Sequence, residues 1–246
     1  MNSFRTLFKL MFHYDLRDWS TMVFTFLFPV ALLLVLALSF KSFVHGVDIV
    51  SQISANVIAF GAAYVGIFSG ASHIATWHEN GMLRTVRNFP LSSNVIIFSQ
   101  AVVGIVVLLA QAVVLVIMGM IMGMALKPTF LSGLLPLVLG YLLFFFLGVI
   151  IALIIPSIAG VSIFANIIIL PLGFIGGAMM PVWMLPSWVQ TIAPYTPLYH
   201  MREALSMMLI GSGTWTHAWI GLLYLAVGCI PLGLISVYGF RWGRSA

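Results

Sequence analysis

Long apolar stretches alternate with short polar segments along the whole chain. A helix needs about 20 apolar residues to cross the hydrocarbon core of a bilayer, and these stretches reach or approach that length. They cover residues 22–40, 53–76, 95–125, 134–155, 158–178 and 215–238. The pattern predicts an all-α integral membrane protein with six transmembrane helices, built as a single domain over residues 1–246.

The first segment, residues 3–19, has the pattern of an amphipathic helix. Apolar and aromatic side chains recur on one side at helical spacing, and polar or basic side chains fall opposite. The apolar side holds Phe4, Leu7, Phe8, Met11 and Tyr14, and the polar side holds Arg5, Thr6, Lys9 and His13. This segment is too polar to span a bilayer, so we expect it to lie in the membrane interface as an anchor.

Small and polar residues inside the spans predict close helix packing. Glycine and serine let a second helix approach, and the span at 53–76 carries Gly61, Gly66, Ser69, Gly70 and Ser72. Gln100 and Gln111 lie within about 20° of each other on a helix of 3.6 residues per turn, so they form one polar stripe. That stripe, and Asn166 in the span at 158–178, either hydrogen-bonds to neighbouring helices or lines a substrate path.

The polar segment at residues 78–90 lies between two long apolar runs and is the clearest candidate to contact a soluble partner. Met82 and Val86 would share one side of a short helix, and Arg84 and Arg87 would share another. An apolar ridge with a cationic flank suits a groove on another protein. The alternative interpretation is an ordinary solvated loop.

Residues 179–213 are apolar but interrupted by proline, so they cannot form one continuous helix. Their tryptophan and tyrosine rings prefer the membrane–water interface. We expect short helices at 187–192 and 198–209 that dip into the bilayer edge without crossing it. The second would place Met201, Leu205 and Met208 on one side.

Glu203 is the notable charged residue of this segment. Tyr199 and His200 precede it by four and three residues, so both can face it on a helix. Arg202 is adjacent in sequence and is expected to point elsewhere.

Composition and charge narrow the class further. The chain is 62% hydrophobic and only 6% charged, against about 25% charged residues in a soluble domain. With the N-terminus inside, seven basic residues face the cytoplasm and three face outward, as the positive-inside rule requires. The inner set is Arg5, Lys9, Arg17, Arg84, Arg87, Arg241 and Arg244, and the outer set is Lys41, Lys127 and Arg202. Both termini and residues 78–90 are then cytoplasmic, and residues 179–213 are external.

Several kinds of chemistry are not indicated. The chain has no Gly-x-x-x-x-Gly-Lys-Ser/Thr loop for ATP, and no nucleophile motif. His78-Glu79 begins like a zinc-protease motif, but Met82 stands where the second histidine would be, so no metal site and no catalytic residue are expected. No carboxylate lies in the middle of a span, where ion-coupled carriers place one. Energy for any transport would therefore come from outside the chain.

Two stretches resemble the permeases of ABC-2 type transporters. Glu79, Gly81, Leu83 and Arg84, followed by Pro90-Leu91-Ser92, resemble the coupling loop of that family. The second stretch resembles the family's C-terminal signature; it contains Gly176-Gly177, Pro181, Leu185-Pro186, Trp188, Pro194, Pro197-Leu198 and Glu203. One departure is that the family often has arginine shortly after the glutamate, whereas here Leu205 and Ser206 follow and Arg202 precedes.

The resemblance implies the roles of these stretches. The loop would dock into a separate ATPase subunit through Glu79, Gly81, Met82, Leu83, Arg84, Val86, Arg87 and Pro90. The broken segment would form re-entrant helices that help to close the exit, an external gate with Pro181, Pro186, Trp188, Pro197, Tyr199 and Glu203. In this family the N-terminal helix also touches the ATPase.

We therefore expect the transport subunit of an ATP-driven exporter of lipophilic or amphipathic molecules such as drugs, peptides or lipids. It would act in a bacterial plasma membrane as a homodimer, or with a similar permease, alongside two ATPase subunits. ATP and magnesium would bind those partners, and this chain would need no cofactor and bind no nucleic acid. The alternatives are a facilitator or channel that works without ATP, and a membrane assembly protein that transports nothing.

Overall fold

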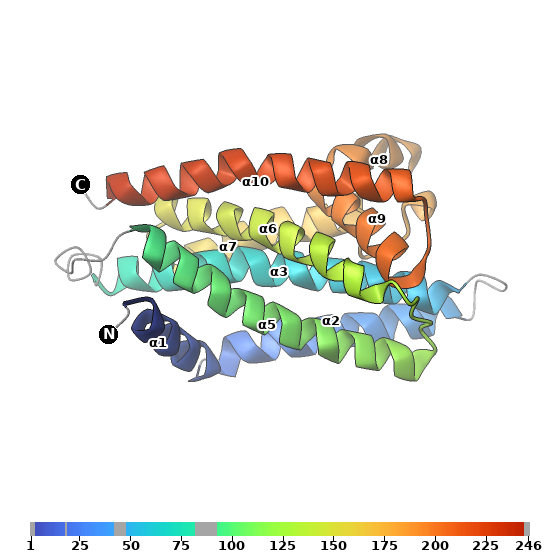
Figure 1. The fold of residues 1–246 in the computed structure, drawn as a ribbon, viewed down its shortest axis with the longest axis horizontal. Coiled ribbons are helices and arrows are strands. Elements are labelled where there is room, and N and C mark those ends of the chain that lie inside the picture. Colours follow the sequence, from blue (N-terminus) through green and yellow to red (C-terminus); the bar gives the residue numbers. More distant parts are fainter. Residues whose placement is uncertain (1–2, 18, 42–47, 82–92, 244–246) are drawn as a thin grey trace.

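The computed structural model describes residues 3–17, 19–41, 48–81 and 93–243, and regular structure within these ranges is helical throughout (Figure 1). The helices are α1 (Ser3–Arg17), α2 (Trp19–Lys41), α3 (Ile49–Glu79), α5 (Ser93–Met122), α6 (Leu134–Ile154), α7 (Ile158–Ile175), α8 (Ser187–Ile192), α9 (Pro197–Ile210) and α10 (Trp215–Gly243). Short 3-10 turns cover Phe130–Gly133, Val182–Met184 and Ala193–Tyr195. The prediction of an all-α protein is confirmed for the described residues.

Within the part of the chain that the structure describes, five helices are long and apolar enough to cross a membrane. They are Ile49–Glu79, Asn94–Met122, Phe130–Ile154, Ile158–Ile175 and Trp215–Phe240, and they match five of the predicted spans. Within α2 the apolar portion is shorter, Thr25–Phe40. The chain is therefore a multi-pass membrane protein, and a sixth span at 22–40 stays a prediction.

The boundaries of α3 differ from those expected for the span at 53–76. The helix begins at Ile49, because the side chain of Asp48 caps it by accepting a hydrogen bond of 3.1 Å from the backbone N–H of Ser51. At its other end it continues to Glu79, and Asn80 caps it there. His78 and Glu79, predicted to lie in a polar loop, therefore form the last residues of a helix.

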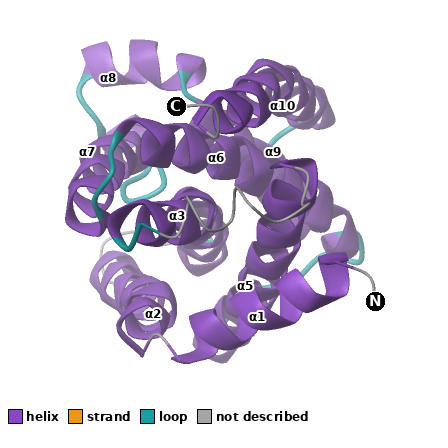
Figure 2. Cartoon of the chain, turned by 90° about the vertical axis from the view of Figure 1, so that its left-hand side faces the viewer, coloured by secondary structure: helices purple, strands orange, loops and turns teal. Residues whose placement is uncertain are grey.

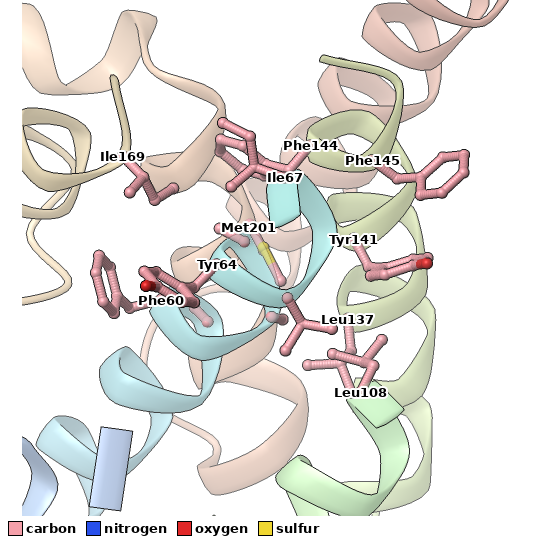
Figure 3. Close-up of a cluster of buried hydrophobic side chains, with 14 of the residues drawn as sticks. Phe60, Tyr64, Ile67, Leu108, Leu137, Tyr141, Phe144, Phe145, Ile169 and Met201 are labelled. Atoms are coloured by element: carbon pink, nitrogen blue, oxygen red, sulfur yellow. The ribbon is translucent and has the colours of Figure 1, made fainter. Parts of the chain in front are cut away.

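Helix α3 lies at the centre of the bundle, with α2, α5, α6 and α7 arranged around it in the end-on view (Figure 2). Most of its length is buried, whereas α7 and α10 present largely exposed apolar surfaces. Its aromatic side chains Phe60 and Tyr64 belong to the same buried cluster as Tyr141 and Phe144 of α6. They lie on the other side of α3, however (Figure 3), where both rings lie beside Phe28 of α2. A polytopic bundle buries such a central helix in protein and leaves the outer helices to lipid.

Glycine makes the contact between α3 and α6 unusually close. A Cβ atom added to Gly70 would fall less than 3.0 Å from the carbonyl oxygen of Phe145, and one added to Gly148 would fall equally close to that of Ile67. A Cβ on Gly66 would lie 2.7 Å from the carbonyl oxygen of Tyr141. The two backbones therefore touch, as the small residues of the span at 53–76 predict.

Helix α1 agrees with the predicted amphipathic helix at 3–19 except that it ends at Arg17. Its polar residues Arg5, Lys9 and His13 are exposed, and Met11 on the other side is fully buried. The helix packs mainly along α5. Tyr14, expected on the apolar side, is 45% exposed.

Candidate functional site

The polar stripe of α5 forms hydrogen bonds between helices. Gln100 donates from Nε2 to the backbone oxygens of Ser69 (2.6 Å) and Gly70 (3.1 Å) on α3. Gln111 donates from Nε2 to the backbone oxygen of Thr25 (2.6 Å) on α2. Both glutamines are buried. The stripe thus joins three helices, and a role for these glutamines in a substrate path stays a prediction.

Asn166 differs from the two glutamines in its bonding. Its Nδ2 donates to the backbone oxygen of Ser162 (2.8 Å), one turn earlier on α7, so it bonds within its own helix. The side chain is half-buried, and its neighbours Ile163 and Ile167 are exposed. A contribution of Asn166 to a substrate path likewise stays a prediction.

The C-terminus of α3 is bonded directly to the turn between α6 and α7. The Oε2 atom of Glu79 accepts a hydrogen bond of 2.7 Å from the backbone N–H of Ile158, the first residue of α7. A carboxylate suits this position, because the first N–H groups of a helix lack partners and carry partial positive charge. Ser157 caps the same end by accepting from the N–H of Gly160 (3.1 Å).

A second bond reinforces this junction. The ring Nδ1 of His78 lies 3.1 Å from the backbone oxygen of Ala152 on α6. Since a carbonyl can only accept, His78 carries its proton on Nδ1 in this contact. Glu79 and His78 together hold the end of α3 to both helices of the α6–α7 hairpin. We call this region, with α1 beside it, the Glu79 end.

Only part of the predicted coupling loop lies in the described chain. Glu79 ends α3, and Gly81 follows with a φ of 66°, a left-handed conformation that suits glycine after a helix C-terminus. The other candidates, Met82, Leu83, Arg84, Val86, Arg87 and Pro90, lie outside the described residues. The structure therefore shows how the loop is anchored on its N-terminal side.

Helix α1 reaches the same end of α3 through a buried histidine. Asp15 Oδ1 and His73 Nε2 lie 3.1 Å apart, although the two groups are not aligned for a hydrogen bond. His73 is almost fully buried, and the rings of Tyr14 and Trp77 lie beside it. This contact, which sequence reasoning missed, places α1 against the last turns of α3.

At the opposite end of the bundle, the proline-interrupted segment forms the short helices that its sequence predicts. Helix α8 covers the expected residues 187–192, and α9 exceeds the expected 198–209 by one residue at each end. Thr196 caps α9 by accepting from the N–H of Tyr199 (3.4 Å), and Gly211 ends it with a φ of 73°. Met201, Leu205 and Met208 are buried on one side, as predicted.

Arg202 does not point away from Glu203, so that prediction is wrong. Its Nη2 pairs with Oε1 of Glu203, and its Nε donates to the backbone oxygen of Gly176 (3.2 Å). The guanidinium also lies 5.1 Å from the centre of the Tyr199 ring. The side chain is long enough to bend back along the helix once Gly176 and Tyr199 hold it, and it is buried. The arginine before the glutamate thus forms an ion pair.

His200 has partners other than Glu203. Its Nε2 lies 2.7 Å from the backbone oxygen of Pro194, and its ring stacks on Tyr224 of α10 with centroids 4.1 Å apart. Burial lowers the pKa of His200, and the Pro194 carbonyl and the Glu203 charge oppose that shift only in part. The histidine is therefore neutral at neutral pH and donates to Pro194.

A cavity of about 460 Å³ lies at this end, which we call the Arg202 end. Helix α3 contributes Ile49, Gln52 and Asn56 to its lining, and residues 181–183 and Gln190 line it from the short helices. Three further lining residues, Tyr199, Arg202 and Glu203, come from α9.

Of the predicted gate residues, Pro181, Tyr199 and Glu203 line this cavity. The others are not among its lining residues: Pro186 precedes α8, Trp188 is exposed on α8, and Pro197 begins α9. The sequence thus identified one side of the cavity, whereas the contribution of α3 was missed.

The comparison with protein families identifies the class. The profile of the ABC-2 type transporter family matches residues 2–210, which is most of the chain. The chain belongs to this family: it is a membrane permease of a transporter and is not itself the ATPase. Membership implies an ABC ATPase as its partner. A comparison with curated proteins found no match.

Proposed function

We propose that this chain is the membrane subunit of an ATP-driven exporter of lipophilic or amphipathic molecules. In this proposal it crosses a bacterial plasma membrane six times, with both termini in the cytoplasm. The Glu79 end faces the cytoplasm and the Arg202 end faces outward, in accord with the distribution of basic residues. ATP and magnesium bind to the partner ATPase.

The observation that carries the proposal is the bonded junction at the Glu79 end. A soluble ATPase can drive the membrane helices only if its contact site is attached to them. Glu79 is the first of the proposed docking residues, and its carboxylate is bonded to the first N–H of α7. A push on that loop would therefore displace α7 and α6 together with α3, and α1 would follow through His73.

Export needs the opposite end to open as this end is pushed. Helices α3, α6 and α7 run between the two ends, α3 along the greatest length (Figure 1). Their motion would be transmitted to the short helices, because α3 packs against α9 and Gly176 at the end of α7 bonds to Arg202. We propose that two permease chains, identical or similar, enclose the path and that two ATPase subunits bind below them.

Transport into inside-out vesicles tests this function. With the permease and its ATPase, we expect an amphipathic fluorescent dye to accumulate only when ATP is present. A matched ATPase variant that binds but does not hydrolyse ATP should abolish accumulation. Equilibration of the dye in ATP-depleted vesicles would instead establish the facilitator. No permease-dependent movement under either condition would favour the non-transporting assembly protein.

A further inference from the structure

Asn56 lies in the wall of the cavity at the Arg202 end and leaves a hydrogen-bonding group unused. Its side chain is 1% exposed, and its Oδ1 has no hydrogen-bond partner among the described residues. Nearly all buried side-chain oxygens in folded proteins have a partner, because a missing one is costly. Oδ1 itself is not exposed to the cavity, so a molecule bound there can supply that partner once the Asn56 amide has rotated to face it.

The neighbouring amides of the cavity are already bonded within the protein. Gln52 accepts at Oε1 from Ser212 Oγ (2.8 Å), and its Nε2 lies 3.5 Å from Ser206 Oγ. Gln190 donates from Nε2 to the backbone oxygen of Leu185 (2.8 Å). These bonds hold the walls in place. Gln190 is exposed, so water can reach its Oε1, and Asn56 is the buried amide of the lining whose acceptor has no partner among the described residues.

The charges of the lining indicate an uncharged ligand. Arg202 and Glu203 are the charged residues among the described lining residues, and they pair with each other. Arg202 is further occupied by Gly176 and Tyr199. An ionic headgroup would lose its hydration here without gaining a counter-charge, which is unfavourable. A neutral hydrogen-bond donor meets no such cost.

The remaining walls are apolar and the size suits a small group. Ile49, Val182 and Trp183 supply hydrophobic surface, and Trp183 is 63% exposed at the margin. The volume of about 460 Å³ lies within the range of roughly 300–1,000 Å³ typical of small-molecule sites. An apolar wall with a buried acceptor at one point matches a molecule with a polar head and an apolar tail.

We propose that this cavity binds the uncharged, hydrogen-bond-donating headgroup of an amphipathic molecule. A hydroxyl or amide N–H of the ligand donates to Oδ1 of Asn56, and the apolar part lies along Val182 and Trp183. This inference rests on the proposed function in one respect: the bound molecule is transported cargo only if the chain is an exporter. The binding itself does not depend on export.

Binding can be measured on the full chain in lipid nanodiscs without an ATPase, so its result is independent of transport. Val182→Cys provides a reporter on the wall, in a Cys229→Ser background that keeps a donor for the backbone oxygen of Leu139. The rate of modification by a small methanethiosulfonate reagent is followed as octylglycerol is added. The comparison probe is the dimethyl ether of octylglycerol, which has the same tail and no donor.

We expect octylglycerol to slow modification in a saturable manner and the dimethyl ether to have little effect. Asn56→Leu, similar in size but unable to accept, should raise the half-saturating octylglycerol concentration about tenfold, as expected for one lost hydrogen bond. Asn94→Leu, the same change at an exposed site on α5, should leave it unaltered. Protection by glycerol alone would show that the headgroup suffices, and protection only by octylglycerol would assign the ligand to an amphiphile.

Two results would overturn the proposal. Equal protection by octylglycerol and its dimethyl ether, measured with Asn56 intact, would show that no donor is recognised. Equal protection of the Asn56→Leu chain, shown to be folded by its elution and melting temperature, would show that Asn56 is not the acceptor. Neither result would bear on whether the chain exports with an ATPase.

Discussion

Replacing Gly70 with alanine is expected to destabilise the protein severely. The new Cβ would fall within 3.0 Å of the backbone oxygen of Phe145, and neither backbone can move aside as a flexible side chain could. Overpacking typically costs about 1–3 kcal/mol, and we expect the upper end of that range here. Helices α3 and α6, which form the largest helix contact of the described chain, would have to separate.

Gly133→Ala is the matched control for Gly70→Ala. Gly133 has an ordinary helical φ of −60°, and its added Cβ would lie 3.4 Å from the end of the Leu205 side chain. The melting temperature of the detergent-purified protein and its elution profile measure both variants. The account of α3–α6 packing fails if the Gly70→Ala variant has the same melting temperature as the unmodified chain. It also fails if both substitutions lower the melting temperature equally.

Arg202→Met is expected to be the most damaging change at the Arg202 end. It removes the bond to Gly176 and leaves the carboxylate of Glu203, whose side chain is 21% exposed, without its cation. Removing one partner of a buried pair costs about 3–5 kcal/mol, and partial exposure of Glu203 favours the lower figure, about 3 kcal/mol. The melting temperature should fall by roughly 6–12 °C, at about 2–4 °C per kcal/mol for a chain of this size.

A second substitution separates loss of the pair from loss of packing. Arg202→Met combined with Glu203→Leu leaves no unpaired charge, so it should recover part of the lost stability. Glu203→Leu alone is the control that completes the cycle. Suppose that the fall in melting temperature of the double variant equals the sum of the falls measured for the two single variants. In that case Arg202 and Glu203 do not interact energetically, and the pair does not stabilise this end.

The hydrophobic pattern was sufficient to predict five spans and the short helices of the proline-interrupted segment. These features follow from local physics: apolar length, the loss of a backbone donor at proline, and helical periodicity. Pro186 and Pro197 placed α8 and α9 to within one residue. A close helix contact on α3 was also foreseeable, because Gly66 and Gly70 stand one helical turn apart, although the sequence did not identify α6 as the partner.

The features that were missed join residues far apart in the chain. Glu79 bonds to Ile158, and Asp15 contacts His73, with no local pattern to pair them. A signal that could have pointed to the first contact is Ser157, a residue type that commonly caps a helix start, where the first N–H groups need acceptors. Arg202 was misjudged because helical spacing describes where a side chain leaves the backbone, and a long side chain can bend back to its neighbour.

ATP hydrolysis by the permease purified with its ABC ATPase tests the central claim most directly. The comparison is between the unmodified chain and a double variant with Glu79→Ala and Arg84→Ala. Loss of the Glu79 cap costs about 0.5–2 kcal/mol, which should leave the chain folded. The control, Asp48→Asn with Lys127→Ala, removes one acid and one base at the opposite end, and asparagine still caps α3.

We predict a stable complex whose hydrolysis depends on the permease. The double variant at the Glu79 end should dissociate from the ATPase or lose that dependence, and the control should behave as the unmodified chain does. If no ATPase co-purifies, or if the double variant leaves both assembly and hydrolysis unchanged, the segment after Glu79 is only a solvated turn. The coupling account would then be contradicted.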